Sequence, residues 1–192
     1  MTSIVFATNN SNKIYEIKQL IPNQFEIKSL KDINCFVDIP ETGDTIKENA
    51  FIKANYIYEN FHENVFADDT GLEVDALDGA PGVYSARYAG QQRNAKDNNE
   101  KLLNQLSENA LRSARFKTVI ALIINGNTYF YEGVCEGHIA ETPRGTNGFG
   151  YDPIFIPLGY NITFAEMDLD EKNKISHRGK AIQKLVRFLN SN

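Results

Sequence analysis

Two adjacent carboxylates, Asp68 and Asp69, follow a short apolar run in the chain. This run, Val65 to Ala67, is typical of a buried strand, and we expect a break at Thr70-Gly71 before a half-buried second strand from Leu72 to Ala76. Neighbouring side chains of an extended backbone point to opposite faces, so one aspartate can face a reaction site while the other braces the backbone. Carboxylates at a strand end suit a hard cation such as Mg²⁺. Acidic strand ends without such a function are also common, so both a metal site and a non-functional strand end fit this stretch.

A polar loop lies between an expected strand, Ile4 to Ala7, and an expected helix whose apolar positions begin at Ile14. Free backbone N–H groups and the dipole at a helix start attract anions. The loop has no glycine and is not a Walker loop, so side chains would have to contact the anion. Simple N-capping by Ser11 or Asn10 explains the loop equally well. Its residues are Thr8, Asn9, Asn10, Ser11, Asn12 and Lys13.

Glu41 and Glu48 lie on either side of the expected start of another helix. Thr45 and Glu48 match a capping box, which gives Glu48 a sufficient structural role. The apolar face of this helix then follows, at Ile46, Ala50, Ala54, Ile57, Tyr58 and Phe61. Glu41, next to a glycine turn, has no comparable structural explanation and is a candidate functional residue.

Residues 142–153 form a glycine-rich loop that carries aromatic side chains. Glycine allows a backbone to approach a ligand closely, and an aromatic ring such as Phe149 could stack on a base. The alternative is a tightly turned connection with a buried Phe149 and Tyr151.

His177 and Arg178 occupy the first turn of an expected C-terminal helix, with Ser176 as its N-cap. Cations at this position oppose the helix dipole by roughly 0.3–1 kcal/mol each when charged. Broken local rules tend to mark functional sites, so we expect these two long polar side chains to reach over a pocket.

The composition predicts an ordinary globular protein of one domain, residues 1–192, with 42% hydrophobic and 23% charged residues. The net charge of −5 makes nucleic acid and anionic membranes improbable partners. Cys35 and Cys135 form no metal or redox motif; we expect reduced core thiols of a cytoplasmic protein, although pairing is not excluded. A strong strand, Phe116 to Ile124, turns at Asn125-Gly126-Asn127 into another, which together with the helices predicts a mixed sheet in an α/β protein.

Five motifs in the chain, taken together, are similar to those of one protein family and span nearly the whole sequence. They are Thr8 to Lys13, Glu41-Thr-Gly-x-Thr45, Asp68-Asp69-Thr70-Gly-Leu, Phe149-Gly-Tyr-Asp152-Pro, and Glu171-Lys172-Asn-x-Ile-Ser-His177-Arg178-Gly. The chain thereby resembles the inosine/xanthosine triphosphate pyrophosphatase family. The resemblance implies Mg²⁺-dependent hydrolysis of dITP, ITP and XTP to the monophosphate and pyrophosphate. It also implies a homodimer and an elongated mixed β-sheet flanked by helices, with two lobes around a central cleft.

The resemblance also implies roles for individual residues. Asp69 matches the proton acceptor and a metal ligand, and Glu41 matches a second metal position. Thr70 stands where bacterial members usually have serine, and its hydroxyl is kept. The residues implied to contact the phosphates are Thr8, Asn9, Asn10, Ser11, Asn12 and Lys13, and those around the base are Phe149, Gly150, Tyr151, Asp152, Lys172, His177 and Arg178.

The residue types fit this chemistry. Lys13 and a helix start can neutralise phosphate charge, and Mg²⁺ held by carboxylates can position water and stabilise the leaving group. A carboxylate bound to Mg²⁺ is a weak base, so Asp69 either accepts a proton or positions water through the metal. Lys172 or Arg178 would donate a hydrogen bond to the six-position carbonyl of inosine and xanthosine. They would face the six-position amine of adenosine donor to donor, and a site built for one group can reject such a mismatch by ~10⁴-fold.

Two other functions remain open at this stage. A related pyrophosphatase could act on modified pyrimidine nucleotides, which would need less room beside Phe149. The chain could also be a nucleotide-sensing module without catalysis, although binding alone would not need the acidic pair of Glu41 and Asp69.

Overall fold

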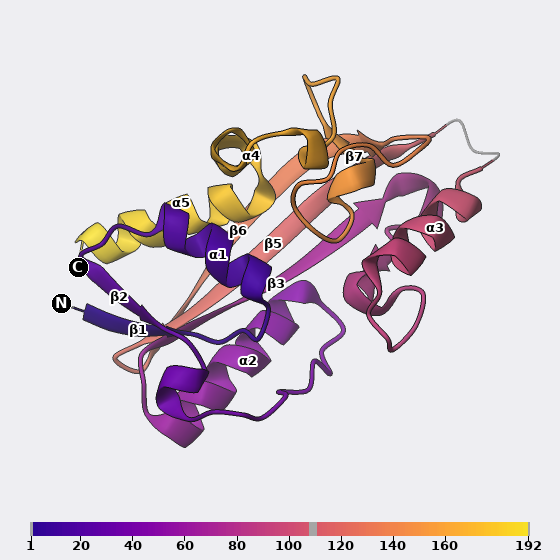
Figure 1. Ribbon diagram of the computed structural model, residues 1–192. Coiled ribbons are helices and arrows are strands. Elements are labelled where there is room, and N and C mark those ends of the chain that lie inside the picture. Colours follow the sequence, from indigo (N-terminus) through magenta and orange to yellow (C-terminus); the bar gives the residue numbers. More distant parts are fainter. Residues whose placement is uncertain (1, 108–110, 192) are drawn as a thin grey trace. The chain divides into compact units, whose positions relative to one another are not determined.

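The computed structural model describes residues 2–107 and 111–191, and within these ranges the strands form a seven-stranded mixed sheet (Figure 1). The strand order is β2-β1-β3-β5-β6-β7, and β4 pairs with β3. β1 is parallel to β2 and β3, whereas β3–β4 and β6–β7 are antiparallel pairs. The predicted α/β class with a mixed sheet is confirmed, and the lobes and the central cleft stay a prediction. The strands are β1 (Thr2–Phe6), β2 (Phe25–Lys28), β3 (Val65–Val74), β4 (Pro81–Gly82), β5 (Ser113–Ile124), β6 (Asn127–Ile139) and β7 (Phe155–Pro157).

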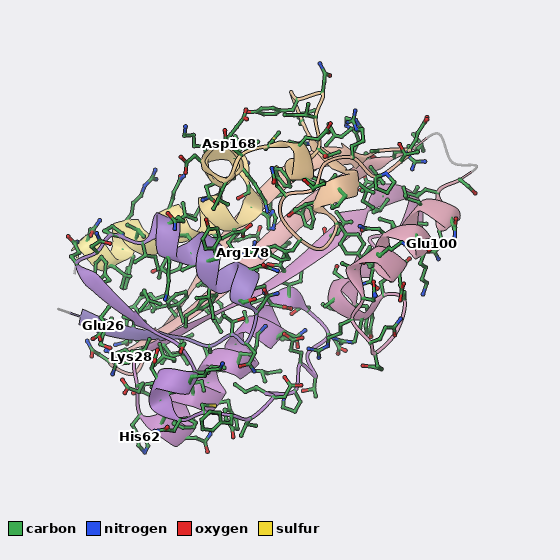
Figure 2. All side chains as sticks on the ribbon, in the orientation of Figure 1. Glu26, Lys28, His62, Glu100, Asp168 and Arg178 are labelled. Atoms are coloured by element: carbon green, nitrogen blue, oxygen red, sulfur yellow. The ribbon has the colours of Figure 1, made fainter. Side chains whose placement is uncertain are left out.

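Side chains near their ends cap the first two helices. The Asn10 side chain accepts hydrogen bonds from the N–H groups of Asn12 and Lys13 and so caps the first helix. Thr45 and Glu48 form the predicted capping box of the second helix, which ends at His62, an exposed residue in the left-handed region at φ 56° (Figure 2). The α-helices of the described residues are α1 (Ser11–Leu20), α2 (Ile46–Phe61), α3 (Ala95–Gln105), α4 (Leu169–Ile175) and α5 (His177–Ser191).

The hairpin between β5 and β6 turns at Asn125 and Gly126, which have φ values of 50° and 78°. Positive φ at both central residues fits a turn whose twist matches the flanking strands, and Asn-Gly is the pair that adopts it most readily. The predicted hairpin is confirmed.

The expected break at Thr70-Gly71 is wrong, because β3 runs without interruption from Val65 to Val74. The backbone beyond the break is held by a partner distant in sequence: the N–H of Leu72 donates to the Ser85 hydroxyl at 2.9 Å. This hydrogen bond and the pairing of β3 with β4 and β5 thus hold in a strand a pair of residues that would favour a turn by themselves.

The chain divides into two compact units, each of which has its own core. The first unit comprises Met1–Asp69, Thr118–Gly133 and Gly179–Asn192, and the second comprises Thr70–Lys117 and Val134–Arg178. We refer to them as the first unit and the second unit.

The core of the first unit lies on both faces of its strands, as period-two alternation requires. Phe6 and Phe66 stack at 4.6 Å between ring centroids on the face that α1 and α5 cover. Val65 and Ala67 pack on the opposite face with Ala50, Ala54 and Ile57 of α2. Figure 1 shows α1 and α5 on one side of these strands and α2 on the other.

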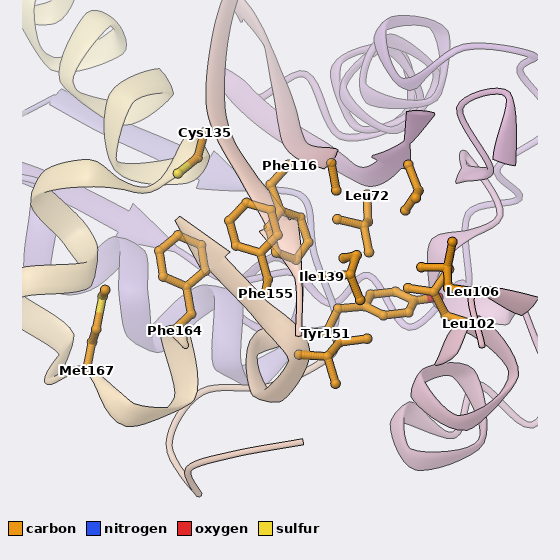
Figure 3. Close-up of a cluster of buried hydrophobic side chains, with 13 residues drawn as sticks. Leu72, Leu102, Leu106, Phe116, Cys135, Ile139, Tyr151, Phe155, Phe164 and Met167 are labelled. Carbon is orange, nitrogen blue, oxygen red and sulfur yellow. The ribbon is translucent and has the colours of Figure 1, made fainter. Parts of the chain in front are cut away.

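The core of the second unit is rich in aromatic rings (Figure 3). Phe116 packs against Phe155 at 4.7 Å between ring centroids, and Phe155 packs against Phe164 at 5.1 Å. Cys135 belongs to this core and Cys35 to the first unit, and both are buried free thiols, as predicted. Across residues 2–107 and 111–191, no helix has both the length and the apolar character that crossing a bilayer demands.

Candidate active site

The first unit gathers five charged side chains around Asp68 and Asp69, in the middle of β3. Asp68 lies two residues after Phe66 in β3, so its side chain points to the same face, toward α1. There the Lys13 ammonium lies 3.0 and 3.1 Å from its two carboxylate oxygens. The Asp68 side chain is fully buried and that of Lys13 is 13% exposed. Asp68 is thus a paired, buried charge.

Asp69 has the opposite parity and faces α2, where it meets a lysine that sequence analysis did not single out. Lys53 Nζ lies 3.4 Å from Asp69 Oδ1 and 2.5 Å from Glu41 Oε1. One ammonium group therefore contacts both of the carboxylates that the family resemblance assigns to the metal. The prediction that Asp68 and Asp69 face opposite sides is confirmed by their different partners, Lys13 and Lys53.

The electrostatics of this cluster are set by burial and by the lysine–carboxylate contacts. Burial raises the pKa of Asp69 above the usual value of an aspartate, although Lys53 and Lys13 counteract this. Burial alone would lower the pKa of Lys53, but Asp69, Glu41 and Asp68 outweigh it, so the pKa of Lys53 is raised. Lys53 is therefore an ammonium ion at neutral pH, and Asp69 is more basic than an exposed aspartate.

Glu41 and Asp69 together offer two carboxylate ligands for Mg²⁺. No group of three or more His, Cys, Asp or Glu side chains that could hold a metal occurs in the described part of the chain. Mg²⁺ is commonly bound by one or two carboxylates together with waters and substrate phosphates, rather than by an all-protein cage. Two converging carboxylates meet that description.

The loop before α1 is polar and open to solvent. Thr8 and Lys13 are half-buried, and Asn9 to Asn12 are exposed. The Asn10 N–H donates to the Thr8 hydroxyl at 3.2 Å, and the Asn10 side chain caps the helix. The capping explanation is confirmed for Asn10, and phosphate binding by this loop stays a prediction.

The second unit assembles its candidate residues around Phe149. Asp152 Oδ2 accepts a hydrogen bond from the Phe149 N–H at 2.7 Å and from Lys172 Nζ at 2.8 Å. Gly148, at φ 73°, approaches this carboxylate so closely that a Cβ there would lie 2.1 Å from Asp152 Oδ2. The glycine-rich loop is therefore folded tightly onto Asp152, which also fixes Lys172.

Two cations lie over the Phe149 ring, which is itself half-buried. Lys172 Nζ is 5.2 Å and the Arg178 guanidinium carbon 5.5 Å from its centroid. Arg178 also donates to the Thr70 hydroxyl at 3.2 Å. Its side chain is buried at the start of α5, and Figure 2 labels it. Thr70, Phe149, Asp152, Lys172 and Arg178 thus form one cluster, and we refer to it as the aromatic cluster.

Tyr151 and His177 are placed differently from the other predicted base-contacting residues. The Tyr151 hydroxyl donates to the Ser85 carbonyl at 2.8 Å, and burial raises the pKa of this tyrosine. The His177 ring stacks on Phe116 at 4.5 Å between centroids within the core. Both side chains thus pack in the core of the second unit, and their contact with a base stays a prediction.

Sequence analysis missed Lys53 and Asn99. Lys53 is seven residues after Ile46 and four after Asn49, on the buried face of α2. The signal available in the sequence was a charged residue on a helix face that is otherwise uncharged. Asn99 is buried on α3, and its amide donates to the Gly150 carbonyl at 3.1 Å. Nothing in the sequence around Asn99 indicates that distant partner.

Solved structures of similar proteins share this fold along their whole length. The chain superposes on a HAM1 protein from Coxiella burnetii with a TM-score of 0.92 at 41% identity, covering 100% of both chains. The Staphylococcus aureus Ham1 protein gives a TM-score of 0.90 at 40% identity, with 99% of both chains covered.

The sequence comparison places the chain in a family. The Ham1 family profile matches residues 4–188, and the chain belongs to this family. It is 58% identical to the dITP/XTP pyrophosphatase of Flavobacterium johnsoniae, over 97% of both chains. It is 59% identical to the dITP/XTP pyrophosphatase of Christiangramia forsetii, over 97% of this chain and 98% of that relative. The resemblance inferred from the five motifs is confirmed.

Proposed function

We propose that the chain hydrolyses non-canonical purine nucleoside triphosphates, namely dITP, XTP and ITP, to the monophosphate and pyrophosphate with Mg²⁺. The curated relatives named dITP/XTP pyrophosphatase support the first two substrates. The observation that carries the chemistry is the convergence of Glu41 and Asp69 on one cation, Lys53. A nucleotide-sensing module without catalysis would have no need for this pair of carboxylates.

The charged cluster of the first unit suits the triphosphate. Glu41 and Asp69 would hold Mg²⁺, which when bound neutralises phosphate charge and lowers the pKa of water. Lys13 and Lys53 supply ammonium groups for anionic oxygens. Burial raises the pKa of Asp69 in the metal-free protein, which favours proton acceptance. Bound Mg²⁺ would make this carboxylate a weaker base, so in holding the metal Asp69 would act by positioning the water.

The aromatic cluster of the second unit suits the base. Phe149 offers a ring for stacking, while Lys172 and Arg178 are hydrogen-bond donors held in place by Asp152 and Thr70. Donors of this kind pair with the six-position carbonyl of inosine and xanthosine and oppose the six-position amine of adenosine. The six-position carbonyl of guanosine also accepts hydrogen bonds from such donors, so the exclusion of guanosine requires a further feature of the pocket.

A pyrophosphate-release assay tests the proposal, using dITP, XTP, ITP, dATP and dGTP at equal concentration, with Mg²⁺ and with EDTA. We expect release from the first three to exceed that from dATP by roughly 10²–10⁴-fold and to stop with EDTA. Preference for a modified pyrimidine triphosphate would favour the related pyrimidine enzyme. Binding of dITP without turnover would favour the sensing module.

We further propose that the chain acts as a cytoplasmic homodimer, as the family resemblance implies. Light scattering on the purified protein tests this assembly. A monomer that retains full turnover would contradict it.

A further inference from the structure

Lys53 is a buried cation that contacts two carboxylates. Its side chain is 11% exposed, and its Nζ atom contacts Glu41 at 2.5 Å and Asp69 at 3.4 Å. The nearby Lys13 lies instead against both oxygens of Asp68. Within this cluster Lys53 is therefore the cation that Glu41 and Asp69 share.

The carboxylates around Lys53 outnumber the ammonium groups. Three carboxylates (Glu41, Asp68 and Asp69) face two ammonium groups (Lys13 and Lys53), so the cluster carries a net charge of about −1. Removing one partner of a buried ion pair is strongly destabilising, because the other charge stays buried without compensation. Glu41 and Asp69 thus need a cation in every state of the protein, and in this structure Lys53 serves as that cation.

We propose that Lys53 is an internal counter-ion that competes with the divalent cation for Glu41 and Asp69. This inference rests on the proposed Mg²⁺ site. Like charges cannot share the two carboxylates at low cost, so cation binding must weaken the contacts of Lys53. The released ammonium then needs a new anionic partner, and a polyphosphate is a partner of the right charge.

The proposal has a thermodynamic consequence. An anion that binds Lys53 frees the carboxylates for the metal, and by linkage the metal promotes binding of the anion to the same extent. The protein would therefore bind Mg²⁺ weakly by itself and more tightly together with a triphosphate. Lys53 would thus protect the carboxylates in the resting protein and couple the two ligands to each other.

The test is a titration of the substrate-free protein with Mg²⁺, followed by calorimetry. Lys53→Met removes the competing charge and keeps the apolar stem, so its Mg²⁺ affinity should rise by roughly tenfold or more. Lys53→Arg keeps the charge and should bind Mg²⁺ like the wild type. Lys47→Met, an exposed change on the same helix, is the matched control and should leave the affinity unchanged.

Thermal melts of the same variants provide a second measurement. Lys53→Met should melt below the wild type without Mg²⁺ and recover at saturating Mg²⁺, because the added cation replaces the lost charge. Lys53→Gln repeats the test with a polar neutral side chain. Unchanged or weaker Mg²⁺ affinity in the neutral variants, or neutral variants that stay unfolded at saturating Mg²⁺, would overturn the proposal.

None of these measurements uses turnover, so this inference and the proposed function can fail separately. Tighter Mg²⁺ binding by Lys53→Met, combined with a wild type that releases no pyrophosphate, would support the counter-ion and refute the hydrolase. Pyrophosphate release by the wild type, combined with unchanged Mg²⁺ affinity in Lys53→Met, would do the reverse.

Discussion

The charged cluster of the first unit and the aromatic cluster of the second hold their residues by different means. Asp68 and Asp69 extend from a regular strand toward lysines on two regular helices, so strand parity and helix position decide which charges meet. Phe149 belongs to a glycine-rich loop whose shape depends on Gly148 and on hydrogen bonds to Asp152. Lys172 and Arg178 then lie over the Phe149 ring.

Because of this difference, substitutions in the two clusters should have different effects. In the charged cluster each side chain is neutralised by another, so a substitution exposes an uncompensated charge and affects chemistry or stability sharply. The aromatic cluster also holds one buried ion pair, Asp152 and Lys172 at 2.8 Å. Its other members, Phe149 and Arg178, are held by cation–π contacts and a neutral hydrogen-bond acceptor, so a substitution at Arg178 should change preference among substrates more than the rate itself. Substitutions in the two clusters test that separation.

Asp69→Asn should have the largest effect on turnover. The change removes one of the two carboxylates that converge on Lys53 and the base candidate with a raised pKa. We expect kcat to fall by roughly 10³-fold or more. The loss of stability should be smaller than in Asp68→Asn, because Lys53 keeps its contact with Glu41. Steady-state assays with dITP across a Mg²⁺ series measure this, and near-normal activity with ordinary Mg²⁺ dependence would remove Asp69 from the chemistry.

Asp68→Asn should affect stability more than catalysis. Asp68 is fully buried, and the substitution removes the carboxylate whose two oxygens the Lys13 ammonium contacts. We expect the free energy of unfolding to fall by roughly 3 kcal/mol, the lower end for a broken buried pair, since Lys13 keeps some contact with solvent. Urea denaturation beside a kcat measurement below the melting temperature checks this. A greater loss of kcat than in Asp69→Asn would show that the two aspartates have exchanged roles.

Arg178→Gln should change selectivity. The helix dipole argument alone predicts unchanged or slightly raised stability, but the buried contacts of Arg178 with Thr70 and Phe149 predict a loss of about 1–3 kcal/mol. We expect the ratio of kcat/KM for ITP over ATP to fall roughly tenfold, mainly through weaker ITP turnover. Full selectivity in a destabilised Arg178→Gln protein would make Arg178 a structural anchor, and base recognition would then rest on Lys172 and the Phe149 loop.

Glu48→Gln should have the smallest effect and serves as a reference for the charged cluster. The Glu48 side chain accepts hydrogen bonds from the N–H groups of Asp44 and Thr45, and glutamine keeps an acceptor oxygen. We expect a loss of about 0.5 kcal/mol in stability and an unchanged Mg²⁺ dependence. Glu41→Gln should instead weaken Mg²⁺-dependent turnover. The opposite ranking in a Mg²⁺ titration would extend the metal site into α2.

Features set by neighbours in sequence were predictable. The capping box of Thr45 and Glu48 and the Asn125-Gly126 turn each need partners within four residues, and both are confirmed. The five motifs also identified the family, because their order along the chain is itself a signal.

Features set by distant partners were not predictable. The continuation of β3 through Gly71 depends on Ser85, and the role of Lys53 depends on Asp69 and Glu41. The sequence shows Lys53 as a charge on an apolar stripe without showing which residues compensate it. Helix α4 was also missed, since seven residues capped by Asp168 give too short a periodic pattern.

The parity of β3 has a consequence for how this chain can change during evolution. A deletion or insertion of one residue early in the strand would move every later side chain to the other face. Asp68 would then face the helix that carries Lys53, and Asp69 the helix that carries Lys13. Point substitutions in Val65 to Ala67 leave Asp68 and Asp69 on their present faces of the sheet, whereas a change of length does not. We therefore expect the spacing between Val65 and Asp69 to be fixed in active members, even where the apolar residues themselves vary.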